Sequence, residues 1–309
     1  MKSILRYNVS VRRGSYGFDA PWALAGLFFG AGALLVLAAV SYVNDVPAAA
    51  IAFLLGALYT LASAGSYLYT TRRGKFAVWA EELGRIEGDE QVLDLGCGRG
   101  AVLLLAAQRL REGRATGIDL WRGIDQSGNG EGVTRANAEA EGVSDRVELV
   151  TGDMRELPFD DGQFDMIVSS LAIHNISTVE GRERAVKEAH RVLRPGGLML
   201  LADFQHTPYY ENVLRELGVI DVRRRDLGWR FWYGGPWFKT EMLEARKPSP
   251  NGGEPRSAGG KAVADGGEAP PAGGEALPDG SEALPDAVAP GLRGAHQDAA
   301  PAKDVGEGA

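Results

Sequence analysis

Cysteine is almost absent from this chain, and positive charge is in deficit. The single cysteine, Cys97, excludes an intramolecular disulfide and any zinc or redox site built from paired cysteines. This usage is typical of a reducing cytoplasm, and we interpret Cys97 as a small packing residue. The formal net charge of -8 argues against general nucleic-acid binding, because phosphate contacts require a surplus of Lys and Arg. The sequence shows no carboxylate cluster of the kind that binds magnesium, so no metal site is predicted.

Charged residues are also absent from two long runs near the N-terminus. One run extends from Trp22 to Val43, and the other extends from Val46 to Thr71. At a rise of about 1.5 Å per residue, each is long enough to cross a hydrocarbon core about 30 Å thick. The sequence therefore predicts two transmembrane helices, at about 22–43 and 46–70, joined as an antiparallel hairpin.

The orientation of this hairpin follows from the flanking Lys and Arg residues. They occur before the first run and after the second, whereas the Asn44-Asp45 turn has none. These residues are Lys2, Arg6, Arg12, Arg13, Arg72, Arg73 and Lys75. Under the positive-inside rule, both termini and the remainder of the chain are cytoplasmic, which predicts a multi-pass membrane protein. Two alternatives stay open: a cleaved signal peptide, with Ala48-Ala49-Ala50 as its cleavage site, and a buried helical hairpin of a soluble protein.

Short aliphatic runs alternate with helical stretches from Gln91 to about Lys247. This pattern is typical of an α/β domain, and it predicts a Rossmann-like, doubly wound fold with a mostly parallel, seven-stranded sheet. The expected strands are Val92–Leu95, Ala115–Asp119, Val147–Val150, Phe164–Ser169, Leu198–Asp203, Val219–Val222 and Glu241–Ala245. The expected helices are Ala101–Arg111, Glu131–Glu141 and Val179–Leu193.

The last part of the chain has a different composition. After Pro248 it is rich in Gly, Ala, Pro and acidic residues and almost free of aromatic ones. Such a composition cannot bury enough apolar surface to fold, so a disordered tail is predicted. The chain is thus divided into an N-terminal segment, the hairpin, the α/β domain and the tail, at residues 1–21, 22–71, 72–247 and 248–309.

A glycine-rich loop is the most informative motif. The apolar strand ending at Leu95 runs directly into Gly96, Gly98 and Gly100, which allow a sharp turn and a close approach of backbone to a ligand. Asp119 ends the next strand, 23 positions after Gly96, near the spacing expected for a carboxylate that binds ribose hydroxyls. Together they predict a nucleoside-containing ligand at the carboxyl ends of the strands.

These motifs resemble those of class I S-adenosylmethionine-dependent methyltransferases, especially the small-molecule branch around the ubiquinone-biosynthesis type. The resemblance covers roughly Phe76 to Lys247. It rests on Asp94–Gly100, Asp119, Gly152-Asp153-Met154, Phe164–Ser169 and Arg191–Gly197. A nicotinamide or flavin dehydrogenase is the alternative, but its fingerprint places the third glycine three positions after the second, whereas Gly100 lies two positions after Gly98.

The resemblance implies that S-adenosylmethionine is the cofactor. It implies that the glycine loop packs against the amino-acid part, that Asp119 binds the ribose, and that Asp153 binds the adenine amino group. The cofactor-binding residues expected are Asp94, Gly96, Cys97, Gly98, Gly100, Asp119, Leu120, Asp153, Met154 and Ser169. A membrane scaffold that binds the cofactor without catalysis is the alternative from a different functional class.

Catalytic residues are harder to predict, because the cofactor is already activated and the protein mainly aligns the acceptor and excludes water. His174, just beyond the fourth strand, is the candidate general base, since the ordinary pKa of histidine lies near neutrality. A residue that only orients the loop or contacts the cofactor is the alternative. Asp203, His206 and Tyr209, after the fifth strand, are secondary candidates.

Two further segments attract attention. Residues 121–129 lengthen the connection after the ribose-binding acid and are expected to form either a lid or a solvated loop. Residues 229–238 gather aromatic side chains around a Gly-Pro turn, which could pack in the core, line a substrate pocket or enter the membrane interface. Because a membrane location raises the local concentration of lipid-soluble molecules, a small or lipid-like acceptor is the predicted substrate.

Overall fold

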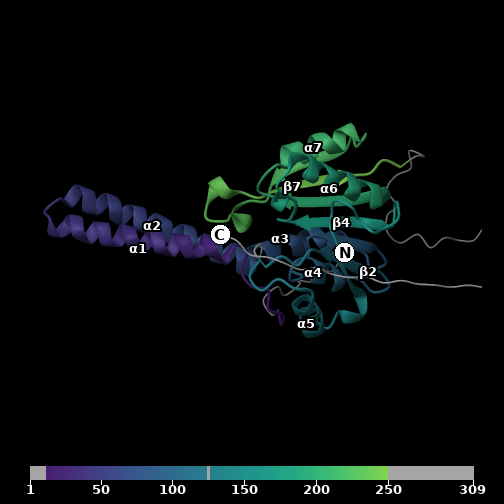
Figure 1. Cartoon of the computed structure of the whole chain (residues 1–309), viewed down its shortest axis with the longest axis horizontal. Helices are drawn as coiled ribbons and strands as arrows, with labels where there is room; N and C mark the ends of the chain where they lie inside the picture. The colour runs from purple at the N-terminus through teal and green to yellow at the C-terminus, as the bar shows by residue number, and fades with distance from the viewer. Residues whose placement is uncertain (1–11, 124–125, 250–309) are drawn as a thin grey trace, which may run out of the picture. The chain divides into compact units, whose positions relative to one another are not determined.

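The computed structural model describes residues 12–123 and 126–249. Helices α1 (Pro21–Val43) and α2 (Pro47–Tyr69) occupy the two uncharged runs and lie side by side as a hairpin (Figure 1). Each begins with proline, whose fixed φ angle suits the first helical position. The turn between them is closed by a hydrogen bond of 2.9 Å from the Val46 N–H to the Ser41 carbonyl.

The second helix continues into the α/β domain without a loop. A π-helical turn, η1 (Thr70–Gly74), leads into α3 (Lys75–Glu82) and a short 3-10 turn, η2 (Leu83–Arg85). Gly74 allows the backbone of η1 to pass close to the backbone at Arg230, because a Cβ atom at Gly74 would lie 1.8 Å from the Arg230 carbonyl oxygen. Trp79 on α3 is buried, and its Nε1–H donates to Ser170 Oγ at 3.0 Å. The hairpin is therefore joined to the sheet by one continuous helical arm.

The sheet has seven strands in the order β3-β2-β1-β4-β5-β7-β6. The strands are β1 (Gln91–Leu95), β2 (Arg114–Asp119), β3 (Val147–Thr151), β4 (Phe164–Ser170), β5 (Leu193–Asp203), β6 (Val222–Asp226) and β7 (Glu241–Arg246). All neighbours pair in parallel except β7, which is antiparallel to both β5 and β6. The strand order reverses between β1 and β4, and ligands of doubly wound sheets bind at the carboxyl ends beside such a reversal.

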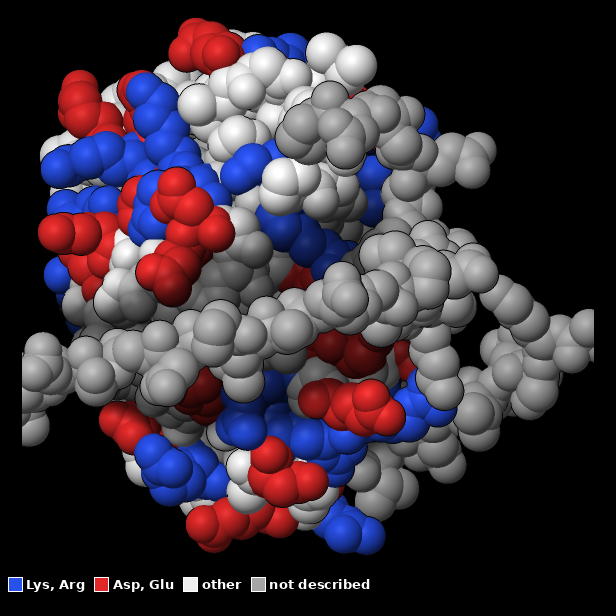
Figure 2. Space-filling model, turned by 90° about the vertical axis from the view of Figure 1, so that its right-hand side faces the viewer, with Lys and Arg blue, Asp and Glu red and all other residues white. Residues whose placement is uncertain are grey.

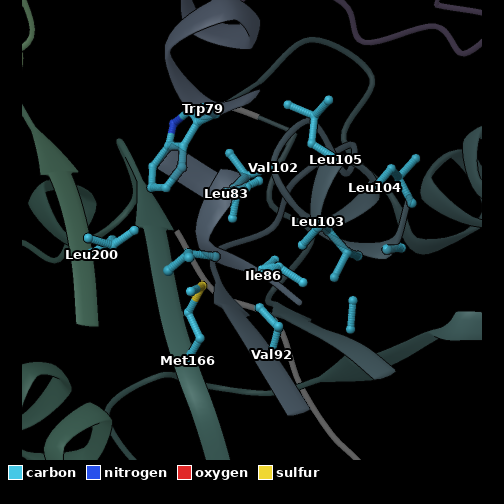
Figure 3. Packing of buried hydrophobic residues seen from close by; sticks show 14 of the residues in the cluster. Trp79, Leu83, Ile86, Val92, Val102, Leu103, Leu104, Leu105, Met166 and Leu200 are labelled. Atoms are coloured by element: carbon cyan, nitrogen blue, oxygen red, sulfur yellow. The ribbon is translucent and has the colours of Figure 1, made fainter. Parts of the chain in front are cut away.

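Helices cover both faces of this sheet. One apolar cluster joins it to α3, α4 (Leu103–Ala107) and α5 (Glu131–Glu141), and Figure 3 shows Trp79, Leu103 and Met166 within it. The other cluster joins it to α6 (Val179–Val192) and α7 (Thr207–Glu216). Strands buried on both faces are mainly apolar, and β1 illustrates this: its covered residues Val92 to Leu95 are aliphatic except for Asp94.

The predicted fold class is confirmed, with differences in detail. The sixth strand occupies Val222–Asp226 instead of the predicted Val219–Val222, and α4 is shorter than the predicted helix Ala101–Arg111. Helix α7 was not predicted. The predicted disordered tail, apart from Pro248 and Ser249, lies outside the described residues, as do Lys2 and Arg6.

Candidate cofactor site

The glycine loop after β1 is compatible only with residues that lack a side chain. Gly96, Gly98 and Gly100 all have positive φ angles, of 70°, 51° and 84°. A Cβ atom at Gly96 would lie 2.3 Å from the Ala172 Cβ, and one at Gly98 would lie 2.7 Å from Gln126 Oε1. The loop is therefore packed tightly against the segments that follow β4 and β2.

Asp119, at the end of β2, holds this loop in place. Its Oδ2 accepts a hydrogen bond of 2.8 Å from the Gly98 N–H, and its Oδ1 accepts one of 2.6 Å from the Trp121 N–H. From α5, Thr134 Oγ1 donates to the Gly98 carbonyl at 2.7 Å. Since a carboxylate offers about four acceptor positions, Asp119 retains capacity for a ligand hydroxyl group.

Asp94 lies in β1 beneath the loop and is only 1% exposed. Neither carboxylate oxygen makes a hydrogen bond of ordinary geometry, although the Leu103 N–H is close enough to favour the ionised form. Burial raises the pKa of Asp94 to about 8, and the negative charge of Asp119 adds to this rise. A buried carboxyl group without a partner is costly. It therefore marks a place where a positively charged or hydrogen-bonding ligand group would be stabilised.

Three further predicted residues surround the loop. Cys97 is buried, and burial raises the pKa of its thiol well above the ordinary value. Met154 follows β3, and its Cε lies 3.3 Å from where a Cβ at Gly96 would be. Leu120 is 43% exposed, next to Asp119. The structure thus brings together residues from β1, β2 and the segment after β3 that are far apart in the sequence.

Two predicted cofactor residues are engaged elsewhere. The Asp153 carboxylate pairs with Arg155, whose Nε lies 2.9 Å from both oxygens, and this interaction lowers the pKa of Asp153. Ser169 is buried in β4, and its Oγ donates to the Leu95 carbonyl at 2.9 Å. Their predicted contacts with cofactor stay predictions, and the Ser169 hydroxyl is already used to join β4 to β1.

His174 occupies the short 3-10 turn η4 (Ile173–Asn175), two residues after the Ala172 that packs on Gly96. Its Nδ1 lies 2.8 Å from Asp203 Oδ1, a close contact whose angle departs from that of a linear hydrogen bond. Asp203 ends β5 and also accepts backbone N–H groups, from Phe204 at 2.8 Å and from His174 at 3.2 Å. A histidine and a buried carboxylate therefore adjoin the glycine loop.

The other two secondary candidates take different positions. His206 precedes α7 with a positive φ angle of 63°. Burial is the main cause that lowers the pKa of His206, and the positive charge of Arg182 adds to it. The Tyr209 hydroxyl donates to Glu183 Oε2 at 2.8 Å. Of the three secondary candidates, Asp203 is the one in contact with His174.

Sequence reasoning missed the residues that hold the loop from outside. Gln126, in the predicted lid, accepts the Arg99 N–H at 3.0 Å and donates through Nε2 to Asp19 Oδ1 at 3.1 Å. Asp19, just before α1, also binds Lys75 Nζ at 2.6 Å and accepts the Tyr233 hydroxyl at 2.8 Å. Residues 124 and 125 of the lid lie outside the described part of the chain. The described part of this insertion bridges the glycine loop and the segment that enters the hairpin.

Comparison with known proteins agrees with this geometry. Residues 93–201 match the family described as methyltransferase domain. This segment of the chain is therefore similar to a methyltransferase domain. The match and the strand order confirm the resemblance to class I methyltransferases, and the matched residues span the glycine loop, Asp119 and His174.

Curated relatives share this region. The ubiquinone/menaquinone biosynthesis C-methyltransferase UbiE of Roseobacter denitrificans is 34% identical over 147 residues, which cover 44% of this chain and 55% of that protein. The same enzyme of Dinoroseobacter shibae is 31% identical over 147 residues, with the same coverage. The chain therefore spans about half the length of the curated relatives it matches.

Solved structures with a similar fold include the [4+2]-cyclase SpnF, at a TM-score of 0.46 and 20% identity, covering 55% of this chain and 80% of that one. Another is a putative S-adenosyl-L-methionine-dependent methyltransferase of Methanococcus maripaludis, at a TM-score of 0.43 and 18% identity, covering 56% of this chain and 85% of that one.

Proposed function

We propose that this chain is an S-adenosylmethionine-dependent methyltransferase that acts at the cytoplasmic face of a membrane on a small, lipid-like acceptor. The observation that carries the proposal is the arrangement of two carboxyl groups at the glycine loop. Asp119 binds the Gly98 N–H at 2.8 Å, while the buried Asp94 beneath it has only the nearby Leu103 N–H and makes no hydrogen bond of ordinary geometry. A nucleoside that also carries positive charge accounts for both groups, because its hydroxyls would donate to Asp119 and its cationic group would pair with Asp94.

The residues present fit this cofactor. Its ammonium group would stabilise the ionised form of Asp94, and its ribose hydroxyls would donate to Asp119. The positive φ angles of Gly96 and Gly98 give the sharp turn that lets backbone approach a ligand closely. When bound, S-adenosylmethionine supplies a methyl group activated by a sulfonium centre. The protein's remaining tasks are to orient the acceptor, to exclude water and to accept a proton where one is released.

His174 is the residue best placed for the last task. Because Asp203 contacts Nδ1, the imidazole is oriented with Nε2 free to accept a proton. The side chain of His174 is 15% exposed and that of Asp203 is 3% exposed, so the pair is shielded from bulk water but still reachable. This role follows the pattern in which a carboxylate fixes the orientation of a catalytic histidine.

The exposed apolar side chains of the α1–α2 hairpin support membrane anchoring. In the most apolar 18-residue stretch of each helix, only 11% of the residues in α1 and 17% of those in α2 are buried. Large apolar side chains such as Phe29, Val36 and Leu55 are 81%, 62% and 61% exposed. A core hairpin of a soluble protein would be covered, so these helices favour lipid as their surroundings. Arg72 and Arg73, at the end of α2, favour a cytoplasmic location for the methyltransferase domain.

The acceptor class follows from this location and from the relatives. A catalytic domain joined to two spans meets lipid-soluble molecules at a high local concentration, and the matched curated relatives are named for ubiquinone and menaquinone biosynthesis. On the face of the domain drawn in Figure 2, Lys and Arg are interspersed with Asp and Glu, unlike the basic surface that a nucleic acid requires.

The proposal is tested with the full chain in lipid nanodiscs. Supplied with a labelled methyl donor and a membrane lipid extract, the protein should transfer label to a lipid-soluble product, and Asp119→Ala should reduce transfer when the methyl donor is below saturation. Calorimetry on the same samples measures cofactor binding separately. Binding without transfer to any membrane extract would favour the non-catalytic scaffold, and transfer only to water-soluble metabolites would contradict the acceptor class.

A further inference from the structure

The segment between β6 and β7 divides its aromatic residues between two environments. We call residues 229–238 the aromatic loop; it contains two short turns, η5 (Trp229–Phe231) and η6 (Pro236–Phe238). Phe231 is fully buried in the core cluster of α3. Trp237 and Phe238, at the far end of the loop, are 69% and 55% exposed. Core packing, one of the roles predicted for this segment, therefore accounts for Phe231 but not for Trp237 and Phe238, nor for Trp229, which is 60% exposed.

The aromatic loop runs alongside α2. The Trp232 carbonyl accepts hydrogen bonds from Thr70 Oγ1 at 2.7 Å and from Ser66 Oγ at 3.2 Å. Further along, Trp237 Nε1 donates to the Tyr59 hydroxyl at 2.6 Å, with ring centroids 6.1 Å apart. Figure 1 shows this segment in light green beside α2. Tyr59 precedes the last residue of α2, Tyr69, by ten positions, which corresponds to about 15 Å along the helix axis.

This position places the end of the loop at membrane depth. A hydrocarbon core about 30 Å thick corresponds to about 20 helical residues, so a span that starts at the Asn44-Asp45 turn ends near residue 66 of α2. Tyr59 lies inside that limit. Its neighbours Leu58 and Leu61 are 54% and 39% exposed, so the surface of α2 here is the apolar surface assigned to lipid.

The chemistry of the loop suits that environment. The Trp237 indole N–H and the Tyr59 hydroxyl satisfy each other, and the backbone N–H groups of Tyr233 and Phe238 bond within the loop, both at 3.1 Å. Non-helical backbone is tolerated near lipid only when its polar groups are paired in this way. Lys239 follows at once; its side chain is 49% exposed, and its Nζ lies 3.4 Å from Glu241 Oε1. Exposed aromatic residues beside a cation are typical of the membrane interface.

We infer that the end of the aromatic loop, residues 235–238, inserts into the cytoplasmic leaflet beside α2, at the boundary between headgroups and acyl chains. The inference rests on the proposed membrane anchoring and adds a third point of contact with the bilayer, supplied by the methyltransferase domain itself. The partner is phospholipid, not a protein, because the exposed surface of Trp237 and Phe238 is continuous with the exposed apolar surface of α2.

The test places an environment-sensitive fluorophore on Phe238→Cys in the full chain, reconstituted in phosphatidylcholine nanodiscs that contain lipids brominated high or low on the acyl chain. The unmodified chain is the labelling control, since Cys97 is buried and the raised pKa of its thiol disfavours reaction. Val36→Cys, in the middle of α1 and 62% exposed, reports on the spans. Ile220→Cys, 86% exposed at the opposite end of β6, is the matched control on the domain.

The expected result is blue-shifted emission and quenching by brominated lipid at positions 238 and 36, with the shallow bromines more effective at 238, and neither effect at 220. If position 36 is quenched while 238 behaves like 220, the aromatic loop does not enter the leaflet, although the anchor stands. If neither 36 nor 238 is quenched, the anchor itself is refuted. A blue shift at 238 without quenching would show that protein covers the loop, and would overturn the inference.

Discussion

Replacing Asp94 with asparagine should make the folded protein more stable at alkaline pH. Asparagine has the shape of a protonated aspartic acid but cannot ionise. In the wild type, the pKa of Asp94 is raised from 3.8 to about 8, mainly by burial. That rise corresponds to at most roughly 6 kcal/mol of destabilisation once the group is fully ionised, at about 1.4 kcal/mol for each pKa unit.

The sign of the pH dependence follows from the two pKa values. Between pH about 4 and about 8, the folded state binds the Asp94 proton more tightly than the unfolded state does, so the free energy of unfolding falls as pH rises. The fall is complete above pH about 8. Wild type and Asp94→Asn should therefore be similar near pH 4, and Asp94→Asn should become progressively more stable toward about pH 9.

Denaturant titrations of both proteins in the same detergent, at about pH 5, 7 and 9, measure this difference, and other titrating groups cancel in the comparison. Cofactor binding supplies a second readout. Because its ammonium group favours the ionised carboxylate, binding at pH 7 should release up to about 0.9 proton from the wild type and none from Asp94→Asn. The assignment of Asp94 as a buried acid that the cofactor ionises would be refuted by two results together. The free energies of unfolding of wild type and Asp94→Asn would change in parallel with pH, and both proteins would release the same number of protons on cofactor binding.

Three other predictions concern the glycine loop and the histidine. Gly96→Ala should weaken cofactor binding at least about tenfold, because the new Cβ would lie 2.3 Å from the Ala172 Cβ. Gly132→Ala is the control, since open space surrounds Gly132, and it should leave binding unchanged. Equal cofactor affinities of the two variants, measured by calorimetry, would contradict this packing. Asp119→Ala removes the partner of the Gly98 N–H and should raise the cofactor Kd by about 10- to 100-fold. His174→Gln should lower kcat about 100-fold without changing cofactor affinity, and Asp203→Asn should lower it less; a matching loss of affinity would point to a structural role instead.

Most of the sheet could be predicted from the sequence, because strands buried on both faces are continuous aliphatic runs. The sixth strand could not, since Arg223 to Arg225 are exposed on an edge strand and the nearest apolar run, at Val219, lies before it. Helix α7 was missed because its buried positions, Thr207, Tyr210, Val213 and Leu214, are few, although Pro208 in its first turn is typical of a helix start.

The centre of the site was predictable because its residues sit in a local motif. The glycine turn and the acid that ends the next strand are specified by two neighbouring strands, so their meeting at Asp119 and Gly98 follows from the fold. The contact between Asp19 and Gln126 joins positions more than 100 residues apart, and no pattern in the sequence marks it. Likewise, the partnership of His174 with Asp203 depends on the adjacency of β4 and β5.

The unbroken passage from α2 through η1 into α3 limits how the methyltransferase domain can move. Because this connection is helical and not a flexible linker, it constrains both the distance and the orientation of the α/β domain relative to the hairpin. Successive residues of a helix are related by a rotation of about 100° and a rise of about 1.5 Å. Removing one residue from Thr70–Gly74 would therefore rotate the sheet by about 100° about the helix axis and bring it about 1.5 Å closer to the hairpin. If the hairpin spans a membrane as proposed, the length of this helical arm sets the distance between the bilayer and the glycine loop.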